Sequence, residues 1–70
     1  MNTYRLGSGP MVNAPGLIAW AVNGAAFIKD RPVMVRIVSE TWGVPADAAR
    51  KLVTKQVAYK VDHDAVVFTA

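Results

Sequence analysis

The chain has 70 residues, of which 53% are hydrophobic and 19% charged, and its formal net charge is +3. This composition is too apolar and too weakly charged for a disordered chain, and the length allows one small core. The absence of cysteine excludes disulfides and thiolate zinc sites. Because so small a core leaves little room for a pocket, we expect no enzyme, no catalytic residues, no metal site and no cofactor.

The longest apolar stretch covers residues 14–28, and Asn23-Gly24 interrupts it. It is shorter than the roughly 20 residues that a bilayer span needs. A signal peptide is also disfavoured, because Arg5 alone supplies a charge before this stretch. We therefore expect a cytoplasmic protein with no role in a membrane.

Residues 1–13 are expected to form a flexible or edge-strand lead-in to a single domain at residues 14–70. Tyr4 and Leu6 are two positions apart and would share one face of a short strand. The segment Gly7-Ser8-Gly9-Pro10 is a loop signal.

A first helix is predicted after Asn13, a good N-cap residue, with Pro15 in its first turn. The apolar residues at helical spacing are Leu17, Trp20, Ala21, Gly24 and Ile28. Apolar residues also cover the adjacent face, which predicts a helix buried almost all round in the middle of the core. Asn23-Gly24 is also a hairpin signal, so a pair of strands over residues 17–28 stays open.

A second helix is predicted from Asp30, as N-cap, to Gly43, as the glycine that ends it. The apolar residues at helical spacing are Val33, Met34, Ile37, Val38 and Trp42. Residues 33–42 are rich in β-branched side chains, so a strand stays open here too. We expect both Trp20 and Trp42 to lie in the core.

A third helix follows Pro45, with Asp47 in its first turn and its basic residues near its end, where they suit the helix dipole. Its buried stripe is predicted to be Ala49, Leu52 and Val53. Residues 57–61 and 65–70 then flank Asp62-His63-Asp64, which predicts two strands and a tight turn.

Two folds follow from these alternatives. The first is an α+β domain with three helices and a C-terminal β-hairpin. The second, if residues 17–28 and 33–42 are strands, is an antiparallel sheet with one helix at residues 45–56.

The run IVSETWGVPADAARKLV, followed by VAYKVDHDAVVFT, resembles the winged helix-turn-helix family. With the preceding helix, the resemblance covers residues 14–69. It implies that Gly43 and Val44 form the turn, that residues 46–56 are a recognition helix for the major groove, and that residues 57–69 are the wing.

The resemblance also implies roles for individual side chains on double-stranded DNA. Arg50 would contact guanine, and Thr54 would face outward beside it. The phosphate contacts would come from Arg36, Lys51, Lys55 and Lys60.

Between Arg50 and Lys60 the chain has four basic residues and no acid, which favours an anionic partner. The resemblance thus implies a small DNA-binding transcriptional regulator or recombination accessory of a phage or other mobile element, acting as a homodimer or beside a partner. Two features depart from the pattern: the turn 62–64 is acidic, and Asp47 is a poor base reader. They favour the alternative of a small phage-type inhibitor, such as an anti-CRISPR, that binds a larger protein instead of DNA.

Overall fold

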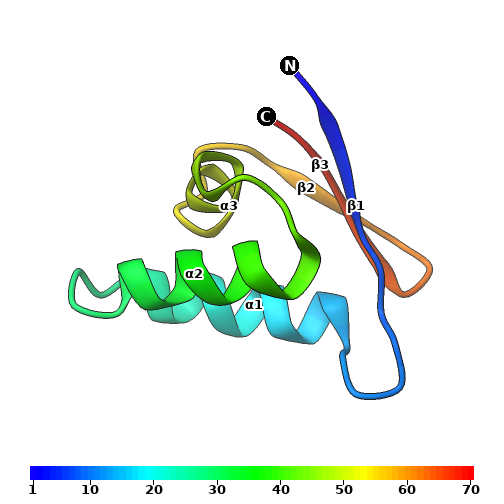
Figure 1. Ribbon diagram of the computed structural model, residues 1–70, viewed down its shortest axis with the longest axis horizontal. Coiled ribbons are helices and arrows are strands. Elements are labelled where there is room, and N and C mark those ends of the chain that lie inside the picture. Colours follow the sequence, from blue (N-terminus) through cyan, green and yellow to red (C-terminus); the bar gives the residue numbers. More distant parts are fainter.

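Three helices and a three-stranded antiparallel sheet make up the protein in this computed structural model, which describes all 70 residues. The elements in chain order are β1 (Thr3–Leu6), α1 (Ala14–Ala25), α2 (Arg31–Trp42), α3 (Ala46–Val53), β2 (Tyr59–Asp62) and β3 (Ala65–Thr69). Figure 1 shows α1 and α2 side by side, α3 packed over them, and the sheet beside the helices. The fold is therefore the three-helix α+β domain, and the prediction of a sheet with one helix is wrong.

α1 begins where the sequence predicts, since the Asn13 side chain accepts a hydrogen bond from the Gly16 amide at 3.2 Å. It ends at Ala25, three residues earlier than the predicted stripe. The Ala26 and Phe27 amides bond to the carbonyls of Asn23 and Gly24, three residues back, which tightens and closes the last turn. The Asn-Gly pair therefore lies in the final turn of a helix, and no hairpin forms there.

Only one side of α1 is buried, formed by Ala14, Ile18, Ala21 and Ala25. The prediction that Trp20 lies in the core is wrong, because 50% of this residue is exposed. Trp20 follows Ile18 by two positions, a rotation of about 200°, which places it on the opposite side of the helix. The prediction for Trp42 is partly correct. Trp42 is partly buried against the core, and its Nε1 donates to the Gly7 carbonyl at 2.9 Å.

The α2–α3 connection depends on Gly43, which caps α2 with φ of 67° in the left-handed region that glycine adopts without strain. The side chain of Asp30, at the other end of α2, makes no capping hydrogen bond. Val44 is buried, and its carbonyl accepts a hydrogen bond from the Ser39 hydroxyl at 2.7 Å. This bond fixes the turn from which α3 starts.

The end of α3 differs from the prediction, because the helix stops at Val53 instead of continuing to residue 56. The Gln56 amide bonds to the Lys51 carbonyl at 2.9 Å and the Lys55 amide to the Leu52 carbonyl at 3.2 Å. Lys55 has φ of 61°, so these bonds form a Schellman motif with lysine at the position that usually holds glycine.

The sheet has the order β1-β3-β2, with Tyr4 opposite Phe68 and Leu6 opposite Val66. The rings of Tyr4 and Phe68 stack with their centroids 5.3 Å apart. Residues 3–6 thus form an edge strand of the sheet. The hairpin strand predicted at residues 57–61 lies instead at Tyr59–Asp62, and the turn is His63-Asp64.

The core is entirely hydrophobic, and no polar or charged residue is buried. Its largest fully buried side chains come from all layers: Leu6, Ile18, Leu52, Val38, Val53 and Val66. Leu52 and Val53 anchor α3 on this core, so the opposite side of α3 is left to the solvent. No helix reaches the length and apolarity that crossing a membrane would require.

Candidate nucleic-acid interface

α3 has two contrasting sides. Its inner side is buried and consists of Ala48, Ala49, Leu52 and Val53. Its outer side carries Asp47, Arg50 and Lys51, whose side chains are 65%, 46% and 38% exposed. The spacing of three and four residues brings these three charges together on one face of the helix.

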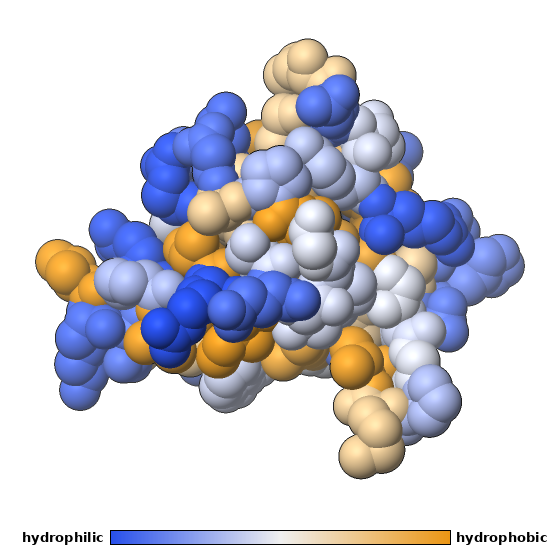
Figure 2. All heavy atoms as spheres, viewed as in Figure 1, coloured by the Kyte–Doolittle hydropathy of each residue, from blue (hydrophilic) through white to orange (hydrophobic).

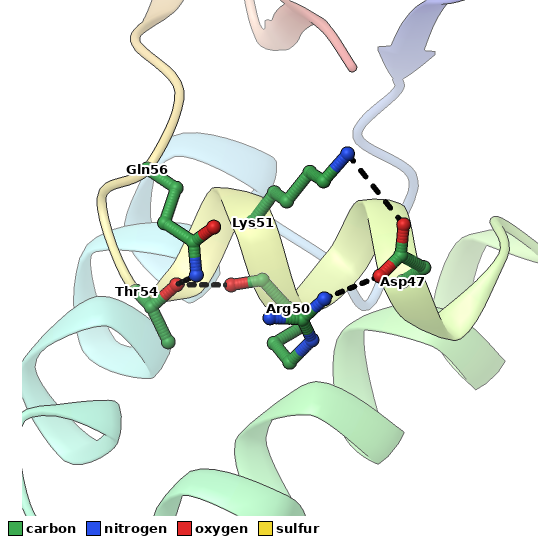
Figure 3. A network of polar contacts seen from close by, with 5 residues as sticks. All are labelled: Asp47, Arg50, Lys51, Thr54 and Gln56. Atoms are coloured by element: carbon green, nitrogen blue, oxygen red, sulfur yellow. Dashed lines mark hydrogen bonds and ion pairs between the residues drawn. The ribbon is translucent and has the colours of Figure 1, made fainter.

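The outer charges of α3 form a network centred on Asp47 (Figure 3). Arg50 Nη2 donates to Asp47 Oδ1, and Lys51 Nζ lies 3.6 Å from Asp47 Oδ2. The hydrogen bond from Arg50, followed by the charge of Lys51, holds the pKa of Asp47 below its usual 3.8. One carboxylate therefore neutralises part of the positive charge on this helix.

Polar side chains also close the C-terminal end of α3. The Thr54 hydroxyl donates to the Arg50 carbonyl at 2.6 Å, and Gln56 Nε2 donates to the Thr54 oxygen at 3.0 Å (Figure 3). The hydroxyl of Thr54 is thus engaged within the protein. Lys55, the next residue, is exposed and forms no ion pair with any acid of the chain.

The acidic hairpin turn is partly neutralised by a residue from the other end of the chain. Arg5 Nη1 donates to Asp62 Oδ2 at 2.7 Å, and this contact holds the pKa of Asp62 below its usual 3.8. His63 Nε2 lies 3.8 Å from Asp62 Oδ1. Asp64 uses its backbone carbonyl to accept the Ser8 hydroxyl and leaves its carboxylate unpaired. No group of three or more potential metal ligands forms here or elsewhere.

The predicted site residues divide into those on α3 and those on other elements. Arg50, Lys51 and Thr54 share α3 and its cap, and Lys55 follows directly. Arg36 is exposed on α2 and Lys60 is exposed on β2, and neither makes a hydrogen bond or ion pair with α3 side chains.

Sequence reasoning missed two participants in these networks. The sequence pattern places Gln56 in the helix, yet its amide supports Thr54 from beyond the helix end. The sequence pattern places Arg5 in the lead-in, and its contact with Asp62 spans 57 positions. Because β3 lies between β1 and β2, the Arg5 side chain reaches Asp62 across the central strand, a contact that no local pattern in the sequence indicates.

The charges left without an ion pair are mostly positive. The unpaired basic residues are Lys29, Arg31, Arg36, Lys55 and Lys60, and the unpaired acids are Asp30, Glu40 and Asp64. The chain can therefore attract a polyanion, and α3 can present an arginine and a lysine to it once Asp47 releases them. In comparisons with known proteins, no family model, no curated protein and no solved structure matches this chain.

Proposed function

We propose that this protein binds double-stranded DNA through the outer side of α3, as a transcriptional regulator or recombination accessory of a phage or other mobile element. The observation that carries the proposal is the two-sided α3, held by the left-handed Gly43 turn after α2, with Arg50 and Lys51 directed outward. The major groove, about 12 Å wide, admits one such helix. The sequence resemblance of residues 14–69 to winged helix-turn-helix proteins favours the same assignment.

The chemistry of each side chain determines which part of the DNA it would contact. Arg50 has the planar donor pair that matches O6 and N7 of guanine, so it would contact a base. Lys51 and Lys55 would contact phosphates, with Lys60 and Arg36 as further phosphate contacts from neighbouring elements. The Thr54 hydroxyl, which already bonds to the Arg50 carbonyl, would support the helix end more than it reads a base. Such a protein would act in the cytoplasm.

Asp47 sets a condition on this mode of binding. Its carboxylate pairs with both α3 cations and would lie near the DNA phosphates. Binding must therefore exchange these internal ion pairs for contacts with DNA. Because ion pairs between exposed side chains are weak, phosphates and bases can compete for Arg50 and Lys51.

The test is fluorescence anisotropy with a labelled duplex of mixed sequence, titrated at several salt concentrations. We expect wild-type affinity to fall steeply with salt, and Arg50→Ala, Lys51→Ala and Lys55→Ala combined to abolish binding. Lys55→Ala alone should reduce the salt slope by about one, because it removes one phosphate contact.

Arg5→Ala is the control, since it removes one positive charge from an exposed side chain on β1, outside both α3 and the proposed DNA contacts. It should leave the affinity and the salt slope almost unchanged. Equal binding by the wild type and the triple variant would show that α3 does not carry the interaction, and the proposal would be wrong.

A second candidate function is inhibition of a larger protein by direct binding. The specific observation in its favour is that Asp47 on α3 and the acidic turn at Asp62 and Asp64 reduce the attraction of the protein for phosphate. In that case a stoichiometric protein partner should copurify with the chain. The complex should also withstand salt concentrations that dissociate DNA complexes. Copurification of nucleic acid without a protein partner would exclude this candidate.

A further inference from the structure

Large apolar side chains are exposed around the connection between α1 and α2. Phe27 is 57% exposed and Ile28 78%, and both lie in the turn itself. Val33, in the first turn of α2, is 41% exposed. We call these three residues the turn patch.

The members of the turn patch lie at one end of the helical pair. The Phe27 carbonyl accepts hydrogen bonds from the Asp30 and Arg31 amides at 3.0 and 3.1 Å, which holds the turn against the start of α2. Figure 2 shows apolar side chains protruding among hydrophilic ones at the end where Figure 1 places this turn.

The size of the turn patch fits the centre of a protein interface. Fully exposed side chains of this kind present roughly 150–250 Å² each, so the three together expose about 300 Å². A stable interface buries about 800 Å² of each partner, with an apolar centre and a polar rim. The turn patch therefore supplies the apolar centre, about a third of what a dimer needs, and the surrounding polar residues would supply the rest.

The charges beside the turn patch are complementary to themselves. Lys29, Asp30 and Arg31 follow one another, and none of them forms an ion pair within the chain. In a dimer with twofold symmetry, a contact between residue i and residue j of the other copy always occurs twice. Lys29 of each copy can thus pair with Asp30 of the other, with no basic or acidic group required from a different protein.

We propose that the turn patch is a self-association surface, occupied by a second copy of this chain in a twofold dimer. Burial of Phe27 and Ile28 against their counterparts supplies the driving force, and the alternating rim charges set the register. The inference does not depend on DNA binding, because its residues lie outside the outer side of α3.

The experiment is sedimentation velocity across a wide range of protein concentrations. We expect the wild type to shift from one chain to two as concentration rises. The double variant Phe27→Asp, Ile28→Asp should sediment as a single chain throughout, because buried unpaired carboxylates oppose association. A wild type that stays monomeric at the highest concentration overturns the proposal.

The matched control is Val61→Asp, because Val61 is 56% exposed on β2, almost as much as Phe27. This variant should dimerise like the wild type, whereas loss of the dimer here with retention in the double variant would assign the interface to β2. Circular dichroism melts establish that each variant is folded. Failure of dimerisation leaves DNA binding by the monomer intact, so the two proposals fail separately.

A charge exchange tests the register of the dimer. Lys29→Asp should weaken the dimer several-fold, since it places two acids opposite each other. Adding Asp30→Lys to the same chain should restore the wild-type dissociation constant. Unchanged association in the single variant would overturn the proposed pairing across the twofold axis.

Discussion

The outer side of α3 and the turn patch are both exposed, but the side chains of α3 contact one another, whereas those of the turn patch contact mainly water. On α3 both cations already contact Asp47: Arg50 donates a hydrogen bond to its carboxylate, and Lys51 Nζ lies 3.6 Å from its Oδ2. In the turn patch, Phe27 and Ile28 have no polar atoms to satisfy and contact water over most of their surface. A partner of α3 must displace an internal contact, whereas a partner of the turn patch displaces only water.

This difference separates two kinds of binding on one small molecule. Binding at α3 exchanges one set of charge contacts for another, so it should depend strongly on salt. Binding at the turn patch removes apolar area from water, so it should depend mainly on that area and less on salt than binding at α3 does. The following predictions test this difference between the two surfaces.

The largest effect is expected when a leucine on the buried side of α3 is compared with an isoleucine in the turn patch. Leu52→Ala should lower the free energy of unfolding by about 3 kcal/mol, because Leu52 is fully buried and its removal leaves a cavity. Ile28→Ala should change it by less than about 0.5 kcal/mol in the monomer. Urea unfolding measures both. Similar losses for the two variants would mean that the turn patch belongs to the core.

The next effect concerns the release of the α3 cations. Asp47→Asn keeps the shape of the side chain and removes its charge, so we expect DNA affinity to rise about threefold to tenfold. Stability should fall slightly, because a negative charge in the first turn of a helix is favourable. Anisotropy and thermal melts should therefore change in opposite directions. A decrease in affinity would indicate that Asp47 positions Arg50 for binding.

A smaller effect is expected at the two non-glycine residues in the left-handed region, Lys55 with φ of 61° and His63 with φ of 57°. Lys55→Gly and His63→Gly should each stabilise the protein by about 0.5 kcal/mol, since glycine adopts this conformation without strain. DNA affinity should fall only for Lys55→Gly, which also loses a charge. Equal affinity of the two variants would remove Lys55 from the binding surface.

The smallest effect is the acid dependence of stability. Asp47 and Asp62 have pKa values below the usual 3.8 in the folded protein, because Arg50 and Arg5 donate to them. The stabilisation from these pairs is present above about pH 4 and is lost as pH falls through the lowered pKa values. Asp62→Asn should therefore show a flatter decrease of melting temperature on acidification than the wild type. Parallel curves would show that the pair with Arg5 contributes nothing.

Most of the helical structure follows from local signals in the sequence. Asn13 and Gly43 act as the caps that their residue types predict, so the starts and ends that depend on them are correct. The errors occur where tertiary structure decides. α3 ends at Val53 because Lys55 adopts a conformation usual for glycine, and no propensity scale identifies a lysine there. Trp20 is exposed because the side of α1 that faces the core is the opposite one, which carries Ile18 and three alanines.

The candidate site was predictable in its residues but not in its pairings. The spacing of Arg50 and Lys51 places them on the outer side of α3 once the buried stripe is known. The spacing of Asp47 also permits its contact with both, although the sequence does not show that one carboxylate engages two cations. The pair between Arg5 and Asp62 depends on the strand order, which requires contacts between the two ends of the chain.

The pairing of β1 with β3 has a consequence for the order of folding. Asn2 and Ala70 exchange backbone hydrogen bonds at 2.8 and 2.9 Å, and the two termini lie side by side in Figure 1. Forming this ladder closes nearly the whole chain into a loop. The entropic cost of this closure is not offset by short-range contacts early in folding. The helices and the β2–β3 hairpin need only neighbouring residues, so we expect them to form first. β1 should then dock last, and in the native state its amides should exchange their hydrogens before those of β3.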